Sequence, residues 1–394
     1  MTVTLVVPPH IRAVISSMLR VETETGAVLG ARIVRTKGGA VRLLGIGIWE
    51  VPSDAYVLQT PSELIVASHG YVAPLAEIEA AGAMAIWVHT HPRDGASPRP
   101  SDLDLRVDRQ LSGVFRLRTG AAFYGALILA KEGKNVRFMG HIDDGETLSP
   151  IDRLWFVGPD LCLRWRDDRP ERSDPGVEYD RQIRAFGPHI QQVVGELSLA
   201  VVGCGGTGSA VAEQLVRMGA QRLALYDPKH VSRSNLTRLY GSHVADVGRA
   251  KTDVVAAHLR SIVPEATITA HTAAITRQSV ARSLMDADLI FGCTDDNAGR
   301  LVLSRFSTYF MTPVIDVGVL LTCDVRGTID GIHGRITTLY PGAACLVCRG
   351  RIDVRRAAVE LRSAEEQTSL EAEGYAPAMP GVEPAVVSFT SWIA

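Results

Sequence analysis

Cysteine is scarce in this chain of 394 residues, which contains only six. So few thiols cannot build a disulfide framework, and the fold must rest on a hydrophobic core. Long apolar runs are missing too, because nowhere do about 18 apolar residues follow one another. The first residues carry no basic leader and are interrupted by Pro8 and Pro9. We therefore expect a cytoplasmic protein that neither spans nor binds a membrane.

An excess of charge of one sign is also lacking. Lys and Arg total 41 against 43 for Asp and Glu, a net charge of −2. No global field would attract a polyanion, so nucleic acid is not an expected partner. The 46% hydrophobic content excludes a disordered chain, and the length favours two domains.

A charged stretch divides the chain. Residues 164–178, RWRDDRPERSDPGVE, hold two prolines and no apolar period, which is typical of a linker. Residues 1–163 alternate strand-like and helix-like segments and predict a mixed α/β domain. The strand-like segments are Val41–Ile48, Ala85–Val88 and Ala121–Leu129, and the helix-like ones are Ile11–Arg20 and Ala73–Ala81.

Residues 179–394 have a different rhythm, that of a Rossmann-like doubly wound α/β domain. A strand at Leu197–Val202, a Gly-rich turn, a helix at Ser209–Met218 and a strand at Arg222–Tyr226 form a βαβ unit. Further buried strands are predicted at Ala266–His271, Asp288–Gly292 and Thr312–Val317.

Two histidines and nearby acids follow the predicted strand at residue 85, in AIWVHTHPRDGASPRPSDLD. His89 and His91 share one face of an extended strand, because alternate side chains do. With a carboxylate from the following loop, Asp102 or Asp104, they would leave one position of a tetrahedral zinc open for water. This pattern predicts a hydrolytic zinc site.

Hydrolysis also needs a proton acceptor, and Glu24 in ETGAVLG is the best upstream candidate, with Glu22 as competitor. Together these segments resemble the JAMM motif of the JAB/MPN metallopeptidases, which act on ubiquitin and ubiquitin-like proteins. The resemblance covers about the first 150 residues. It implies zinc ligands His89, His91 and Asp104, a general acid/base Glu24, and Ser101 as support for the oxyanion. The gap between His91 and Ser101 is longer than is usual in the family, which keeps Asp102 as the alternative ligand.

A nucleotide site is predicted in the second half. The segment GCGGTG, residues 203–208, fits G-x-G-x-x-G between a strand and a helix. Asp227 closes the next strand and suits ribose hydroxyls. These features alone fit an NAD-dependent oxidoreductase equally well.

Further polar residues favour adenylation over hydride transfer. Asn235, Arg238 and Lys251 follow Asp227 and could neutralise phosphates, and Asp295 in GCTDDNAGR could hold magnesium. From about Tyr179 onward the chain is similar to the ThiF/MoeB-like adenylating enzymes. That resemblance implies ATP and Mg²⁺ bound by Gly203, Gly205, Gly206, Gly208, Asp227, Asn235, Arg238, Lys251 and Asp295. It also implies that Arg181 reaches ATP from the other subunit of a homodimer.

The cysteines qualify this resemblance. Cys345 and Cys348 match the first half of the family's four-cysteine structural zinc site, but the second half is absent. The ending PAVVSFTSWIA resembles the start of a late helix, so the C-terminus is expected to be incomplete. No cysteine follows residue 348, so a thioester at the usual place is not expected. Cys323 is the remaining candidate, although its apolar neighbours favour a buried strand cysteine.

The combined prediction is a bifunctional enzyme. Its first domain would trim a ubiquitin-like or sulfur-carrier β-grasp protein, or cleave an isopeptide bond, and its second would adenylate the exposed C-terminal glycine. The alternative keeps the adenylating domain but makes the first domain a non-catalytic binding module for the ubiquitin-like protein.

Overall fold

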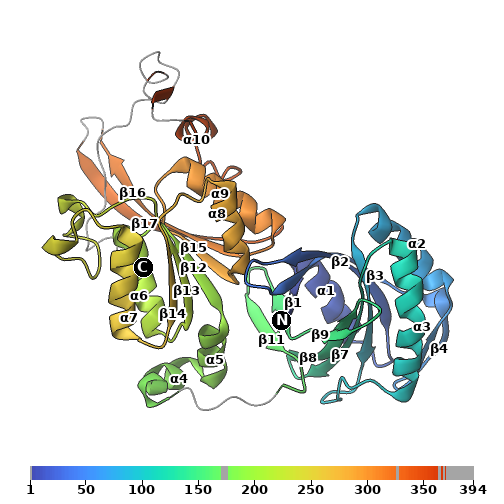
Figure 1. Ribbon diagram of the computed structural model, residues 1–394. Coiled ribbons are helices and arrows are strands. Elements are labelled where there is room, and N and C mark those ends of the chain that lie inside the picture. Colours follow the sequence, from blue (N-terminus) through green and yellow to red (C-terminus); the bar gives the residue numbers. More distant parts are fainter. Residues whose placement is uncertain (1, 170–175, 325–327, 363–364, 367–368, 370–394) are drawn as a thin grey trace. The chain divides into compact units, whose positions relative to one another are not determined.

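The computed structural model describes residues 2–169, 176–324, 328–362, 365–366 and 369 (Figure 1). Residues 1–172 and 173–394 form two compact units. The boundary lies inside the stretch predicted as a linker.

The first unit is built on a mixed sheet of nine strands. In chain order these are β1 (Val3–Val7), β2 (Gly26–Arg35), β3 (Val41–Glu50), β6 (Met84–His91), β7 (Tyr124–Glu132), β8 (Asn135–Asp143), β9 (Leu148–Pro150), β10 (Arg153–Phe156) and β11 (Cys162–Trp165). Their spatial order is β11-β10-β1-β3-β2-β6-β7-β8-β9. A separate hairpin consists of β4 (Tyr56–Gln59) and β5 (Leu64–Val66), after the short 3-10 helix η1 (Ser53–Ala55).

Helices cover both faces of this sheet. The apolar side chains of α1 (Pro9–Met18) pack on the face that carries Ala27 and Leu29. Those of α2 (His69–Ala80) and α3 (Asp102–Thr119) pack on the opposite face, with Val28 and Trp87. This alternation along β2 is the period of two that a strand buried on both faces requires.

The predicted linker begins too early in the sequence. Arg164 and Trp165 belong to β11, which pairs with β10. Asp167 then accepts two hydrogen bonds from Arg137, at 2.5 and 2.8 Å, and the Arg169 guanidinium lies over the Trp165 ring. Charge density suggested a solvated segment, but these charges pair with groups of the first unit.

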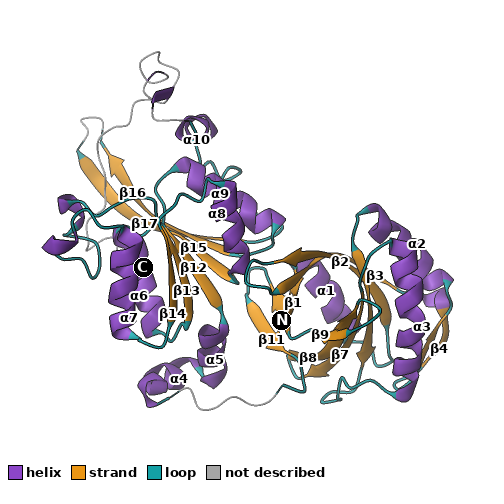
Figure 2. Cartoon of the chain, in the orientation of Figure 1, coloured by secondary structure: helices purple, strands orange, loops and turns teal. Residues whose placement is uncertain are grey.

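The second unit contains a six-stranded sheet, drawn in orange on the left of Figure 2. Its strands are β12 (Ser198–Val202), β13 (Arg222–Tyr226), β14 (Thr267–His271), β15 (Leu289–Gly292), β16 (Val314–Cys323) and β17 (Ile329–Leu339). The order is β14-β13-β12-β15-β16-β17, and only β17 is antiparallel to its neighbour. The chain moves outward from β12 to β14 and then returns to β15, so a topological switch point lies between β12 and β15. The predicted doubly wound α/β fold is confirmed.

The helices of this unit are α4 (Asp180–Phe186), α5 (Pro188–Glu196), α6 (Gly206–Arg217), α7 (Lys251–Ile262), α8 (Gln278–Ala281), α9 (Asn297–Tyr309) and α10 (Val354–Glu360). Short 3-10 helices are η2 (Val177–Tyr179), η3 (Arg233–Asn235), η4 (Val244–Asp246) and η5 (Arg282–Asp286). The helix predicted from Ser209 begins at Gly206 instead, so the last glycines of the loop form its first turn. Throughout the described part of the chain, no helix is both long and apolar enough to cross a membrane.

Candidate functional sites

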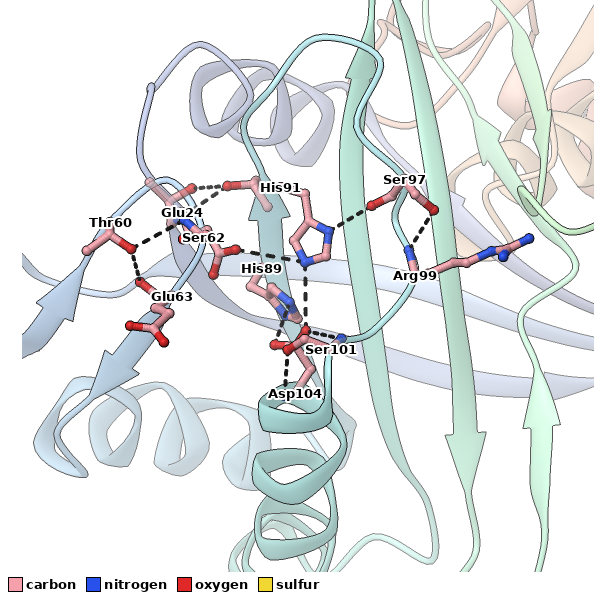
Figure 3. Close-up of polar contacts among 12 residues, drawn as sticks. Glu24, Thr60, Ser62, Glu63, His89, His91, Ser97, Arg99, Ser101 and Asp104 are labelled. Atoms are coloured by element: carbon pink, nitrogen blue, oxygen red, sulfur yellow. Dashed lines mark hydrogen bonds and ion pairs between the residues drawn. The ribbon is translucent and has the colours of Figure 1, made fainter.

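Two imidazoles and a carboxylate converge in the first unit (Figure 3). His89 and His91 end β6 on the face that α3 covers, and Asp104 lies in the first turn of α3. The Asp104 carboxylate lies 3.2 Å from His89 Nε2 and 3.8 Å from His91 Nε2. One ligand atom from each residue falls within 4.8 Å of the others. Asp102 is exposed and outside this group.

Local interactions aim these three side chains. His91 Nδ1 lies 2.8 Å from the Ser97 carbonyl oxygen, which can only accept, so Nδ1 carries the proton and Nε2 keeps its lone pair. Ser101 is the N-cap of α3: its hydroxyl accepts from the Asp104 amide, and the Asp104 carboxylate accepts from the Ser101 amide. The Pro-rich loop, which was predicted to include Asp104, therefore ends at Ser101. Asp104 lies in the first turn of α3, where the capping box fixes it.

Glu24 lies at the rim of the same site. Its carboxylate is 3.9 Å from His91 Nε2 and is buried, whereas Glu22 is exposed. The carbonyl oxygen of the next residue, Thr25, accepts from the Thr90 amide, the Thr25 amide donates to the Thr90 hydroxyl, and the two hydroxyls lie 3.0 Å apart. Thr90 sits between the two histidines, so this contact fixes Glu24 against them. Sequence reasoning missed this role of Thr90.

The charges of the site perturb one another. Burial raises the pKa of Glu24 above its ordinary value, although the nearby histidines oppose the shift. Burial alone would lower the pKa of His91, but the nearby Asp104 carboxylate, the hydrogen bond to the Ser97 carbonyl oxygen and the charge of Glu24 raise it. For Asp104, burial acts to raise the pKa, but the two histidines beside it and the hydrogen bond from the Ser101 amide more than reverse that effect, so its pKa is strongly lowered. A carboxylate that stays ionised beside imidazoles suits a cation.

A cavity of about 580 Å³ opens beside this group and shares His89 and Asp104 with it. Most of its wall is apolar and comes from β5, α3 and the sheet, for example Val66, Leu103 and Ile128. A polypeptide bound at the histidines could place a side chain there.

The second unit has a cavity of about 700 Å³ at the carboxyl ends of its parallel strands. Gly203 follows β12 with φ +90°, and a Cβ there would lie 2.7 Å from the Cys293 carbonyl oxygen. At Gly208 a Cβ would lie 1.7 Å from the Gly203 carbonyl oxygen. Only glycine permits this packing, which brings the N-terminus of α6 against the loop. Gly203, Gly205 and Gly206 line the cavity, and Gly208 supports the loop from behind.

Asp227 and Asn235 are both buried in the cavity wall. The Asp227 carboxylate accepts from the amides of Cys204 and Lys229, each at 2.8 Å, which fixes it beside the glycine loop. The Asn235 side chain accepts from the Ser232 amide in a capping box of η3. Both hold their positions without a ligand.

Cations and an acid complete the wall. Lys251, the first residue of α7, is only 7% exposed and has no ion pair within the described residues. Arg238 also lines the cavity. Asp295 lies at the open side, 77% exposed and 3.9 Å from Lys229 Nζ. Arg181, on α4, is exposed and does not line the cavity of its own chain.

Sequence reasoning missed three charged residues at the β16–β17 side of this cavity. Asp316 is 1% exposed and binds the Arg300 guanidinium with both oxygens, at 3.0 and 2.6 Å. Arg335 Nη2 lies 3.9 Å from the same carboxylate. Arg300 and Arg335 line the cavity. An aspartate inside the apolar strand run VIDVG was the one sequence signal for this cluster.

The cysteine pair Cys345 and Cys348 belongs to the second unit, whereas the candidate metal triad belongs to the first. Cys345 Sγ and Cys348 Sγ are 3.5 Å apart, and the Cys348 amide lowers the pKa of the Cys345 thiol. Within the described residues, no third histidine, cysteine or acid joins them to form a metal-binding group. The side chain of Cys323 falls outside the described part.

A glycine loop that opens a helix, an acid after the second strand and a lysine-lined cavity at the switch point are typical of nucleotide-binding α/β folds. The model of the ThiF family matches residues 179–384. The chain therefore belongs to the ThiF family. The first unit lies outside the residues that the family model matches.

Several curated proteins are similar to this chain. It is 32% identical over 168 residues to ubiquitin-like modifier-activating enzyme 5 of Oryza sativa subsp. japonica, covering 39% of this chain and 38% of that protein. It is 27% identical over 172 residues to the SAMP-activating enzyme E1 of Haloferax volcanii, covering 43% and 60%. It is 30% identical over 180 residues to the molybdopterin-synthase adenylyltransferase of Escherichia coli K12, covering 45% and 68%. The match thus spans less than half of the rice protein.

A solved structure of E. coli MccB with ATP is also similar. Its TM-score is 0.40 and its identity 16%, and the match covers 55% of this chain and 60% of that one.

Proposed function

We propose that the second unit adenylates the C-terminal carboxylate of a ubiquitin-like or sulfur-carrier protein with ATP and magnesium. The observation that carries the proposal is the buried Lys251, which faces a cavity at the switch point without a carboxylate partner among the described residues. A buried ammonium group is costly unless an anion compensates it. The names of the similar proteins, a modifier-activating enzyme and a molybdopterin-synthase adenylyltransferase, support the substrate class.

The chemistry follows from the order of groups along the sheet edge. Asp227 would accept from the ribose hydroxyls, and the glycine loop and the N-terminus of α6 would receive phosphate oxygens. Lys251 and Arg238 would neutralise the charge that builds when a carboxylate attacks the α-phosphorus, and Asp295 would hold magnesium for the leaving pyrophosphate. Arg181 would act from the other subunit of a homodimer, since it lies outside its own cavity.

Nucleotide binding tests this proposal. Fluorescent ATP should bind the wild type, and Lys251→Ala should weaken binding by about 10-fold or more, because a charge-assisted bond is lost. Arg305→Ala, an exposed change on α9, is the matched control. Binding of NAD in preference to ATP would instead support the oxidoreductase.

For the first unit we propose a zinc-dependent peptidase or isopeptidase of the JAB/MPN type. His89, His91 and Asp104 fit zinc by donor chemistry, and the buried His89 Nε2 has no hydrogen-bond partner of good geometry among the described residues. Zinc held there would polarise a carbonyl and lower the pKa of a bound water.

The chain's own residues supply the rest. Glu24, buried and with a raised pKa, is suited to take a proton from water and pass it to the leaving amine. Ser101 would contribute its hydroxyl hydrogen, since its oxygen already accepts from Asp104. A polypeptide would place a side chain in the apolar cavity beside His89. The same partner could thus be trimmed by one unit and adenylated by the other.

Metal content separates this proposal from a non-catalytic binding module. Elemental mass spectrometry should find about one zinc ion per chain fewer in His91→Ala than in the wild type. His69→Ala, which replaces an exposed histidine of the same unit, should keep its zinc. Cys348→Ala should keep its zinc as well. Unchanged zinc in His91→Ala would leave the first unit as a binding module.

A further inference from the structure

The cluster of Arg300, Asp316 and Arg335 has no part in the nucleotide contacts proposed above. It lies where β16 and β17 border the 700 Å³ cavity. Asp316 pairs with Gly292, the last residue of β15, and Arg335 pairs with Gly318, two residues further along β16. A Cβ on Gly318 would lie 3.9 Å from Arg335 Nη2, so the guanidinium passes over that glycine.

The cluster holds more positive than negative charge. The single carboxylate of Asp316 faces both guanidinium groups, and Arg300 takes both of its oxygens. Arg300 also donates to the Arg351 carbonyl oxygen at 3.4 Å, so its donors are largely used. Other acids nearby have donors of their own: Glu360 accepts from the Ala298 amide.

Arg335 is the member of the cluster without a hydrogen bond from its side chain to another described residue. Its contact with Asp316 is too long for a hydrogen bond. Its buried Nε has no hydrogen-bond partner among the described residues. Burial and the neighbouring Arg300 charge lower its pKa, and the Asp316 carboxylate only partly opposes this shift. A planar fork of N–H donors in this state suits a carboxylate or phosphate.

The sheet order indicates which anion fits. Asp227 follows β13, the glycine loop follows β12 and Asp295 follows β15, so nucleotide and magnesium would occupy three neighbouring positions. Arg335, on β17, lies four strands from β13, about 19 Å at the usual strand spacing. In the proposed arrangement the glycine loop, Lys251 and Arg238 already bind the phosphates of ATP. The remaining end of the cavity is left for the second substrate of the reaction.

We propose that Arg335, held against Asp316, binds the C-terminal carboxylate of the acyl substrate and positions it beside Asp295. This proposal rests on the proposed adenylation. It assigns Arg335 a part in substrate recognition and leaves nucleotide binding to the other residues of the cavity. Asp316 acts through Arg335 and Arg300 and is a positioning residue.

The test uses the full chain, ATP and an octapeptide that ends in Gly-Gly with a free carboxylate. ATP–pyrophosphate exchange is measured while peptide and ATP are varied separately, and the peptide amide serves as the uncharged comparison. Arg335→Ala should raise KM for the peptide by about 10- to 100-fold, the loss of one charge-assisted pair, with KM for ATP within about twofold. Arg335→Lys should lie between wild type and Arg335→Ala. Arg349→Ala, an arginine outside the cavity wall, should change neither constant.

Several outcomes would overturn the subsite. These are unchanged constants in Arg335→Ala, a rise in KM for ATP as large as that for the peptide, or equal exchange with acid and amide. The second would show that Arg335 binds a phosphate of ATP. If the wild type binds ATP but shows no ATP–pyrophosphate exchange with the free-acid peptide, this result also contradicts the subsite. Failure of the wild type to bind ATP would instead contradict the proposed adenylation.

Discussion

The two sites of this chain are organised on different scales. In the first unit His89, His91, Asp104 and Glu24 lie within 4 Å of one another in a chain of contacts. In the second, the polar residues are spread along a sheet edge, and Asp227 and Asn235 are each held by hydrogen bonds from backbone amides. A single ion requires side chains that converge, whereas a nucleotide and an acyl chain require separated contacts. A substitution in the first site should therefore disturb several functional residues together, and one in the second should act locally.

The largest effect is expected at Glu24. Glu24→Gln keeps the shape of the side chain but removes its capacity to take a proton, so hydrolysis should fall by about 10²- to 10⁴-fold. Zinc content should stay at the wild-type value, which separates proton transfer from metal binding. The assay is cleavage of a β-grasp protein extended beyond its Gly-Gly, with Glu22→Gln as the control. Full activity in Glu24→Gln would remove Glu24 from the mechanism.

Asp316→Ala should give the next largest effect. It leaves two guanidinium groups in a poorly solvated place, and removal of one partner of a buried ion pair costs about 3–5 kcal/mol. Hydrogen exchange with mass spectrometry at rising urea concentration measures the stability of each unit separately. Only peptides of the second unit should lose protection. In the double variant Asp316→Leu with Arg300→Met, part of the stability should return; no recovery would argue against the charge explanation.

A pair of glycine substitutions tests the phosphate loop. Gly208→Ala would bring a Cβ within 1.7 Å of the Gly203 carbonyl oxygen, and such overpacking should cost about 3 kcal/mol or more. Gly205→Ala meets nothing within 4 Å and should leave the unfolding midpoint of the second unit nearly unchanged. Equal midpoints for the two variants in urea denaturation would show that the loop is not tightly packed.

Ser101→Ala should produce a smaller effect that reaches two properties. Loss of the N-cap of α3 costs about 1 kcal/mol. Because the same hydroxyl fixes Asp104, zinc affinity should also fall, by about 10-fold. Chelator competition measures the affinity, and Asp102→Asn is the control on the same helix turn. An affinity unchanged in Ser101→Ala would show that Asp104 does not depend on the capping box.

The smallest effect is expected at Glu213, a residue of α6 that does not line the cavity of the second unit. Burial would raise its pKa, but hydrogen bonds from His258 and Arg217 outweigh this and lower it below the ordinary 4.5. A lowered carboxylate pKa stabilises the fold above its unfolded-state value and loses that contribution as pH falls through the folded-state value. Glu213→Gln should therefore destabilise the second unit by about 0.5 kcal/mol at pH 7 and by less near pH 4. A constant difference in urea midpoints at both pH values would contradict the assignment.

Prediction from the sequence succeeded where short-range pattern decides. Short apolar runs placed β6 and β12, and the glycine segment placed the turn before α6. The prediction was wrong at residues 164–169. Charged side chains there were expected to be solvated, but they form pairs with residues far away in sequence, as Asp167 does with Arg137. A charged side chain carries no local signal of whether its partner is water or another residue.

The sequence by itself determined the residue types of both sites and their order along the chain. Histidines two apart on a strand share a face, and glycines between a strand and a helix admit close packing, because backbone geometry dictates both. The motif already favoured Asp104 and Glu24 over Asp102 and Glu22, but tertiary structure alone placed Asp104 and Glu24 beside the histidines and brought Arg335 to Asp316. Those placements depend on strand register and on the packing of α3, which join segments tens of residues apart through contacts that no local pattern encodes.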